Sequence, residues 1–196
     1  MLYTFSRFIS AVLCRILFRI KVCGEKNIPA KGGFILASNH CSFLDPVILA
    51  VACSRKLNFM ARHDLFFNPV LGWWMSRVGV FPVKRNTADR SALREALKRL
   101  NRGKPLLLFP QGARKNGLDD KASIPLAGVG FLAAKTNVAV IPAFIKGTDK
   151  ALPKGAKYIK PGRICVCFGR QINIERRLPY QEITQLIMAN IRQLSC

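Results

Sequence analysis

Residues 34–45 read Phe-Ile-Leu-Ala-Ser-Asn-His-Cys-Ser-Phe-Leu-Asp, an apolar run that is followed directly by polar residues. The apolar part, 34–38, predicts a strand that is buried on both faces of a sheet, because a short continuous apolar run is typical of such strands. Asn39 and His40 follow the end of this strand, and a helix is expected over 46–53. A strand that leads through a polar loop into a helix is the unit from which α/β sheets are built.

The same alternation continues along the chain. Further strands are expected at 57–61, 78–82, 106–109, 138–145 and 163–168, and helices at 64–78, 88–101, 125–135 and 179–194. Continuous apolar strands alternating with helices predict an α/β fold with a central, mostly parallel sheet covered by helices. The chain has 196 residues, half of them apolar, so residues 24–196 are expected to form one such domain.

Residues 2–20 precede this pattern and have a different character. On a helical wheel the apolar face holds Leu2, Phe5, Ile9, Val12, Leu13, Ile16, Leu17 and Ile20, and the polar face Thr4, Arg7, Arg15, Arg19 and Lys21. Arginines interleaved with the apolar residues disfavour both a spanning helix and a signal peptide. We therefore expect residues 1–23 to form an amphipathic helix that anchors the protein in a membrane interface. A helix whose apolar face packs on the protein's own core is the alternative.

The chain is strongly basic. Thirty-two Lys and Arg against ten Asp and Glu give a net charge of +22, which predicts attraction to polyanions such as nucleic acid, anionic lipid headgroups, phosphorylated metabolites or acidic proteins. Thirteen Phe against three Tyr and a positive mean hydropathy favour an anionic membrane surface. A basic nucleic-acid-binding protein is the more remote alternative, because the chain has no recognisable nucleic-acid-binding motif.

The cysteines and histidines indicate neither a disulfide framework nor a metal site. Seven cysteines occur without a Cys-x-x-Cys pair, so reduced thiols are expected. There are two histidines, His40 and His63, in the whole chain, which disfavours a catalytic metal.

His40 and Asp45 lie five positions apart in the loop after the first predicted strand. A carboxylate that accepts a hydrogen bond from Nδ1–H of an imidazole fixes its tautomer and leaves Nε2 free to take a proton from a hydroxyl group. Asp45 also directly precedes Pro46, so a helix cap is the simpler interpretation of this residue taken alone. Cys41 leaves open a thiol hydrolase with a cysteine nucleophile, although adjacent side chains point apart.

Two later loops are basic and also follow predicted strands. Lys84 and Arg85 come after the strand at 78–82, and Gly112 and Arg114 come after another. The carboxyl ends of parallel strands meet at one edge of a sheet, where ligands usually bind. Arginine binds phosphate in a bidentate manner, and glycine lets the backbone approach closely. The sequence therefore predicts a phosphate site beside a general base.

Four stretches resemble, in order, the four motifs of the glycerolipid acyltransferases, the family that includes the 1-acylglycerol-3-phosphate acyltransferases. The first motif, N-H-x-S-x-x-D, is matched by 39–45, the third, F-P-E-G-T-R, by 109–114, and the fourth, V-I-P-hydrophobic, by 140–143. The second, G-x-x-F-x-x-R, is resembled by Gly79, Phe81 and Arg85, with Phe81 one position before the place that the pattern gives to Phe. Each match alone is modest, but the four in this order over roughly residues 25–170 are specific. The resemblance implies the glycerol-3-phosphate acyltransferase type of α/β fold.

The resemblance implies transfer of a fatty acyl group to oxygen. His40 would remove the proton of an acceptor hydroxyl and Asp45 would orient the imidazole, so that the hydroxyl oxygen attacks the thioester of acyl-CoA or acyl-carrier protein without an acyl-enzyme. The acceptor would be the lysophospholipid 1-acylglycerol-3-phosphate and the product phosphatidic acid. The implied substrate-binding residues are Arg85, Gln111, Gly112, Arg114 and Gly79, with Lys84 and Arg62 as helpers. No metal and no cofactor besides the acyl donor is implied.

The third motif departs from the family pattern at two positions. Gln111 stands where the family usually has Glu, and Ala113 where it has Thr. The amide keeps the shape of the carboxylate but loses its charge, so another lysolipid or an amino-lipid remains open as the acceptor. With the basic N-terminal helix, the resemblance implies an enzyme at the cytoplasmic face of a membrane, peripheral or monotopic, without a nucleic-acid partner.

Overall fold

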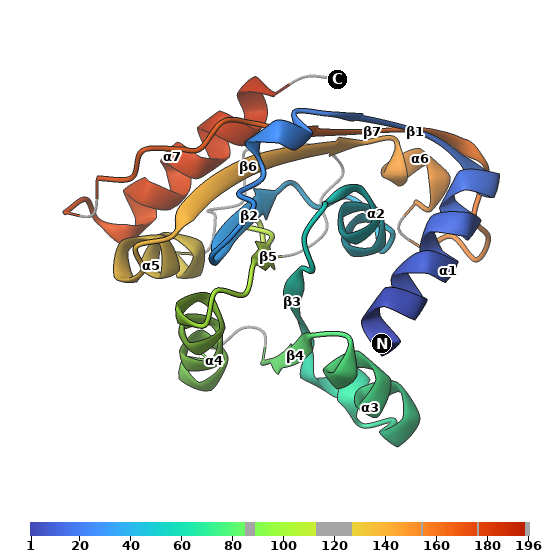
Figure 1. Ribbon diagram of the computed structural model, residues 1–196, viewed down its shortest axis with the longest axis horizontal. Helices are drawn as coiled ribbons and strands as arrows, with labels where there is room; N and C mark the ends of the chain where they lie inside the picture. The colour runs from blue at the N-terminus through green and yellow to red at the C-terminus, as the bar shows by residue number, and fades with distance from the viewer. Residues whose placement is uncertain (85–88, 113–126, 154, 176, 195–196) are drawn as a thin grey trace.

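The computed structural model describes residues 1–84, 89–112, 127–153, 155–175 and 177–194. Across these residues, seven strands form one sheet in the order β1-β7-β6-β2-β5-β3-β4 (Figure 1). Neighbouring strands are parallel except β6 and β7, which are antiparallel. The predicted α/β fold with a mostly parallel sheet is therefore confirmed.

The elements of the described residues follow closely on one another. The strands are β1 (Phe18–Cys23), β2 (Phe34–Ser38), β3 (Asn58–Arg62), β4 (Val80–Val83), β5 (Leu106–Leu108), β6 (Ala139–Lys146) and β7 (Gly162–Phe168). The helices are α1 (Leu2–Leu17), α2 (Asp45–Ala52), α3 (Pro69–Arg77), α4 (Arg90–Asn101), α5 (Gly128–Lys135), α6 (Thr148–Ala151) and α7 (Tyr180–Gln193), with short 3-10 helices η1 (Glu25–Asn27) and η2 (His63–Phe66). None of the described helices combines the length and the apolarity that crossing a membrane requires.

Strand β2 lies at the centre of the sheet, between β6 and β5, and all five of its residues are buried. Phe34 and Leu36 belong to the apolar cluster that includes buried residues of α2. Ile35 and Ala37 belong to the cluster on the other face, with α4, α5 and α7. Figure 1 shows these three helices on the opposite side of the sheet from α1, α2 and α6. Burial on both faces explains why this strand could be recognised from an unbroken apolar run.

The N-terminal helix is shorter than expected. It ends at Leu17, and Phe18–Cys23, which the sequence pattern placed in the anchoring segment, forms strand β1 parallel to β7. Phe18 is buried whereas Arg19 and Lys21 are exposed, the alternation that a strand with one solvent face requires. Helix α6 was not expected either.

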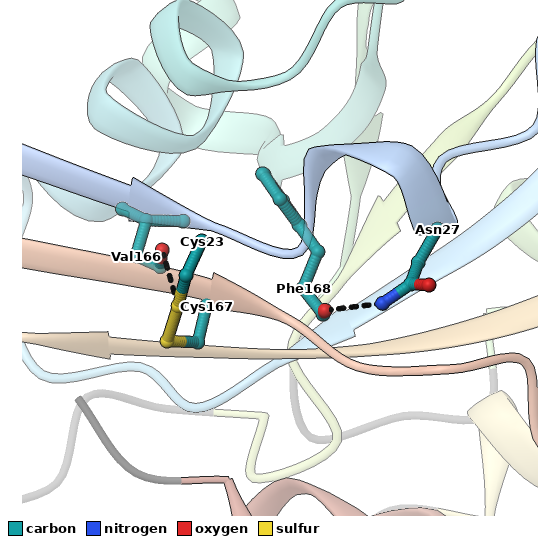
Figure 2. Close-up of a disulfide and its surroundings, with 5 residues drawn as sticks. All are labelled: Cys23, Asn27, Val166, Cys167 and Phe168. Carbon is teal, nitrogen blue, oxygen red and sulfur yellow. Dashed lines mark hydrogen bonds between the residues drawn. A yellow bond between two sulfur atoms is a disulfide. The ribbon is translucent and has the colours of Figure 1, made fainter.

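The expectation of reduced thiols is wrong for one pair of cysteines. Cys23 on β1 lies directly opposite Cys167 on β7 in the register of the two strands, with their Cα atoms 4.7 Å apart. The two residues form a disulfide (Figure 2). A little further along, the side-chain amide of Asn27 donates a hydrogen bond to the carbonyl oxygen of Phe168 at 2.9 Å. Both contacts hold the N-terminal strand at the edge of the sheet.

Candidate active site

The loop after β2 folds back so that His40 and Asp45 meet. The Oδ2 atom of Asp45 lies 2.7 Å from Nδ1 of His40, 2.7 Å from the backbone nitrogen of Cys41 and 2.8 Å from that of Ser42. Two backbone donors make Oδ2 an acceptor, so Nδ1 of the imidazole carries the proton and Nε2 is left as the basic nitrogen. Asp45 is fully buried and His40 is 8 % exposed.

The helix-cap interpretation of Asp45 is wrong. Asp45 is the first residue of α2, the cap position is Leu44, and no side chain caps this helix end. The carboxylate instead turns toward the preceding loop and is held by its backbone N–H groups. Its second oxygen, Oδ1, is buried and has no hydrogen-bond partner among the described residues. The carboxylate thus serves the imidazole and the loop rather than the helix.

Two residues that were not singled out as functional fix the loop. The side-chain amide of Asn39 donates to the carbonyl oxygen of Ile145 on β6 and accepts from its N–H, both at 2.8 Å. The hydroxyl group of Ser42 donates to the carbonyl oxygen of Leu152, after α6, at 2.9 Å. Asn39 and Ser42 are the N and the S of the N-H-x-S-x-x-D pattern, so the pattern itself already indicated these two residues. These bonds tie the imidazole to two neighbouring elements.

The segment after β5 completes the surroundings of His40. The ring of Phe109 stacks on the imidazole with centroids 4.0 Å apart and planes 19° from parallel. The Oε1 atom of Gln111 accepts a hydrogen bond from the backbone N–H of His40 at 2.9 Å. Gly112 has a positive φ of 69°, which favours glycine. Because β5 lies beside β2 in the sheet, the first and third motif segments meet at the same edge.

The other predicted binding residues lie further along the edge or outside the described residues. Arg62 ends β3 and forms an ion pair with Asp64, with Nε 2.9 Å from the carboxylate. Lys84 follows β4, which is three strands from β2 and hence about 14 Å away in the sheet. Arg85 and Arg114 lie outside the described residues, as does Ala113.

Gly79 does not lie at the edge of the sheet that holds the other predicted binding residues of the described part of the chain. It precedes β4, whereas Lys84 follows that strand, so Gly79 lies at the opposite edge of the sheet from the loop of His40. Its φ is 96°, and a Cβ atom there would come within 3.0 Å of the Asn58 side chain. The assignment of Gly79 to substrate binding is therefore corrected, because this position requires glycine for the backbone conformation.

The arrangement fits one class of protein: an α/β fold that holds a histidine, oriented by a buried carboxylate, at the carboxyl edge of the sheet. The pair suits removal of a proton from a hydroxyl group, since the carboxylate stabilises the imidazolium ion that forms. In the cysteine interpretation the thiol of Cys41 would face the imidazole. The Cys41 thiol accepts a hydrogen bond from the side-chain amide of Asn39 at 3.4 Å, and Nδ1 of His40 is engaged by Asp45.

Comparisons with known proteins identify the family. Residues 19–146 match the family described as Acyltransferase, and the chain belongs to this family. It is 32 % identical over 145 residues to a chloroplastic 1-acyl-sn-glycerol-3-phosphate acyltransferase of Arabidopsis thaliana, which covers 72 % of this chain and 40 % of that protein. It is 30 % identical over 115 residues to a lyso-ornithine lipid O-acyltransferase of Pseudomonas aeruginosa, covering 57 % of this chain and 42 % of that protein.

A solved structure shares the fold. The crystal structure of a 1-acyl-sn-glycerophosphate acyltransferase, PlsC, from Thermotoga maritima superposes with a TM-score of 0.77 at 22 % identity, covering 97 % of this chain and 78 % of that one. The chain spans about two fifths of the length of both curated relatives. The resemblance to glycerolipid acyltransferases is thus confirmed at the level of the family and of the fold.

Proposed function

We propose that this acyltransferase moves a fatty acyl group from a thioester, acyl-CoA or acyl-carrier protein, to the free hydroxyl of 1-acylglycerol-3-phosphate, giving phosphatidic acid. The observation that carries the proposal is the buried His40–Asp45 pair, with Nδ1 and Oδ2 at 2.7 Å, inside the N-H-x-S-x-x-D pattern. The name of the Arabidopsis relative supports this acceptor.

The chemistry follows from the orientation of the imidazole. Nε2 of His40 removes the proton of the acceptor hydroxyl as its oxygen attacks the thioester carbonyl carbon. The tetrahedral intermediate then collapses, the carbon–sulfur bond breaks, and the leaving thiolate takes the proton back from the imidazolium. Asp45 stabilises the positive charge on the ring throughout. The neutral base is regenerated in one turnover without a covalent acyl-enzyme.

Binding of the acceptor phosphate is assigned to the basic segments after β4 and β5. Arg85 and Arg114 are proposed to bind the phosphate group in a bidentate manner. Gly112, with its positive φ, supports this assignment because a glycine without Cβ lets backbone N–H groups approach an anion. Lys84 is a further cation of the same edge, and Arg62 takes part only if the anion displaces Asp64 from its ion pair.

The protein is proposed to act at the cytoplasmic face of an anionic membrane, anchored by its N-terminal segment. The net charge of +22 supports this location, as do exposed apolar side chains of α1 such as Phe5, Phe8 and Ile16. These side chains also speak against the alternative in which the apolar face of the helix packs on the core. The proposed acceptor is a lysolipid with a long acyl chain, so an enzyme bound at the lipid surface meets this substrate in the leaflet.

A second candidate acceptor is a lyso-ornithine lipid, an amino-lipid with the same kind of free hydroxyl. Two observations favour it: the relative of that name in Pseudomonas aeruginosa, and the neutral Gln111 in place of the usual Glu. The catalytic pair would act in the same way on either acceptor.

The test is acyl transfer by the purified protein in detergent micelles. Lysophosphatidic acid, lyso-ornithine lipid and other lysolipids are supplied with acyl-CoA or acyl-carrier protein, and wild type is compared with His40→Ala and with the matched control His63→Ala in exposed η2. Turnover of lysophosphatidic acid should fall at least about a hundredfold in His40→Ala and stay near wild type in the control. Turnover of lyso-ornithine lipid alone would select the second candidate, and equal rates in both variants would contradict the base.

A further inference from the structure

Helix α1 is attached to the protein by a face that includes Tyr3 and Arg7. Arg7 donates from one guanidinium nitrogen to the carbonyl oxygens of Val51 and Cys53, at 3.2 and 2.9 Å, at the C-terminal end of α2. The hydroxyl oxygen of Tyr3 accepts from the backbone N–H of Leu57 at 3.2 Å. The contacts of Arg7 are favourable because the carbonyl groups at the C-terminal end of a helix attract a cation. The helix is therefore held in one orientation.

This orientation turns the apolar face of α1 outward. The large exposed side chains are Phe5 and Phe8 at 64 %, Ile9 and Val12 at 42 %, Leu13 at 52 % and Ile16 at 74 %. A row of this kind is costly to leave in water, about 25 cal/mol for each square ångström of apolar surface. Contiguous exposed apolar surface in a soluble domain usually marks an interaction site.

The segment η2–α3 carries a second set of exposed apolar side chains. Phe67 and Val70 are each 76 % exposed and Trp73 is 54 % exposed. The indole N–H of Trp74 donates to the hydroxyl oxygen of Ser6 on α1 at 3.2 Å. Beneath this bond, residues of α3 and β4 form an apolar cluster with the first turn of α1, and Figure 1 shows α3 beside the N-terminal end of α1. The two segments are thus neighbours in space.

Most of the exposed large apolar side chains of the described residues lie in these two segments. The charges of the two segments are mainly positive: residues 2–20 contain Arg7, Arg15 and Arg19 and no acidic residue, and Asp64, the acidic residue of η2, is paired with Arg62. The guanidinium of Arg77 lies 5.2 Å from the ring centre of Trp73. An occupant of this surface must be both apolar and anionic, which describes an anionic lipid leaflet. A second copy of a chain with a charge of +22 would be repelled.

We propose that the outward face of α1 and the η2–α3 segment form one docking surface for an anionic bilayer, so that Phe67, Val70 and Trp73 enter the lipid beside Phe5 and Phe8. The inference deepens the proposed function and rests on its membrane location. Tryptophan is favoured at the membrane interface, and arginine beside it meets lipid phosphates. Because Arg7 also holds the end of α2, and α2 begins at Asp45, which positions His40, the surface sets the height of the candidate active site above the lipid.

The chain offers an internal probe, since Trp73 and Trp74 are its two tryptophans. The wild-type protein is mixed with vesicles of phosphatidylcholine and phosphatidylglycerol in a ratio of about 7:3, with and without brominated acyl chains. We expect the tryptophan emission to shift to shorter wavelength on binding and to be quenched by the brominated lipid. Vesicle binding without shift or quenching would mean that α1 docks alone and would overturn the inference.

Variants supply the second arm. Phe67→Ser combined with Val70→Ser should lower the partition coefficient into these vesicles at least about tenfold. The control Tyr180→Ser changes an exposed aromatic side chain at the start of α7 and should leave the partition coefficient within about twofold, because α7 lies on the other side of the sheet from α1 (Figure 1). Circular dichroism confirms that each variant folds. Unchanged partition of the double variant, or a dimer that dissociates in this variant without a change in partition, would contradict the docking surface. Acyl transfer in micelles tests the proposed function separately, because detergent dissolves the substrates without a leaflet.

Discussion

The charge of Asp45 is the feature of the site whose removal gives the sharpest test. Its Oδ2 atom receives three hydrogen bonds, from Nδ1 of His40 and from two backbone N–H groups, while Oδ1 is buried with no partner among the described residues. In Asp45→Asn, the amide oxygen can take the place of Oδ2 and keep all three bonds, with the amide nitrogen in the place of Oδ1. The substitution therefore removes the negative charge and little else.

The expected loss can be worked from these contacts. Hydrogen bonds to a charged group contribute about 1.5–3 kcal/mol and those between neutral groups about 1 kcal/mol, and the bond from Nδ1 becomes more important as the imidazole turns positive. General-base catalysis typically contributes about 10²–10⁴ in rate, which corresponds to about 3–5 kcal/mol of activation free energy. We expect the kcat of Asp45→Asn to be lower than that of the wild type by a factor of about 10²–10⁴. KM should change little, because the fully buried carboxylate lies behind the imidazole.

The assay is steady-state acyl transfer in micelles with the acceptor that the wild type prefers. Asp149→Asn, at an exposed position of α6, is the matched control and should keep wild-type kcat. Far-ultraviolet circular dichroism checks that the variant is folded. Retention of more than about a tenth of wild-type kcat by Asp45→Asn, or a loss confined to KM, would refute the assignment of Asp45 as the group that stabilises the imidazolium.

Two further predictions concern stability and the connection between β2 and β5. The backbone N–H of Lys84, followed by the hydroxyl group of Ser91, holds the pKa of Asp89 at about 2, below its ordinary 3.8. Because this folded-state pKa is lowered, its stabilisation is complete above the unfolded value and is lost as the pH falls through about 2. Asp89→Ala should thus lower the free energy of unfolding by about 1 kcal/mol near neutral pH, because a helix cap is lost, and by progressively less below pH 3.8. Urea unfolding across this pH range measures the difference, and a difference that stays constant with pH would contradict the assignment. Gln111→Leu should leave the buried N–H of His40 without an acceptor, lower the free energy of unfolding by about 1–3 kcal/mol and lower kcat. Gln111→Glu keeps an acceptor oxygen and should have a higher kcat than Gln111→Leu. Equal kcat in both variants would show that this bond does not position the base.

The fold could be predicted where burial makes the pattern unambiguous. The pattern of residues 34–38 predicts a strand with the bounds that the structure has, because a short, almost continuous apolar run is typical of a strand covered on both faces. Residues 18–23 were assigned to a helix although Phe18, Ile20 and Val22 alternate with Arg19 and Lys21. On a helical wheel Ile20 also falls on the apolar face, so the wheel does not reveal the change of period from 3.6 to 2 at Phe18.

The active site could be predicted in part. The pairing of His40 with Asp45 was expected from the loop and from the family motif, but the two backbone N–H groups that bend Asp45 back depend on the conformation of the loop. Strand direction could have placed Gly79 correctly, since a residue before a four-residue strand and one after it lie at opposite edges of the sheet. The orientation of α1 could not be predicted from the sequence, because it depends on the carbonyl groups to which Arg7 donates in the folded protein.

The replacement of the usual Glu by Gln111 in the third motif has different consequences for the position of His40 and for the recognition of the acceptor. The bond from the N–H of His40 to Oε1 of Gln111 needs an acceptor oxygen, and glutamine and glutamate supply that oxygen equally well. Gln111 is buried, 8 % exposed, so a glutamate there would bring a second negative charge close to His40 and Asp45. The neutral amide therefore keeps the position of the base and changes the charge that an approaching acceptor meets. For this reason we expect the substitution to act on the choice of acceptor lipid and to leave the proton transfer by His40 intact.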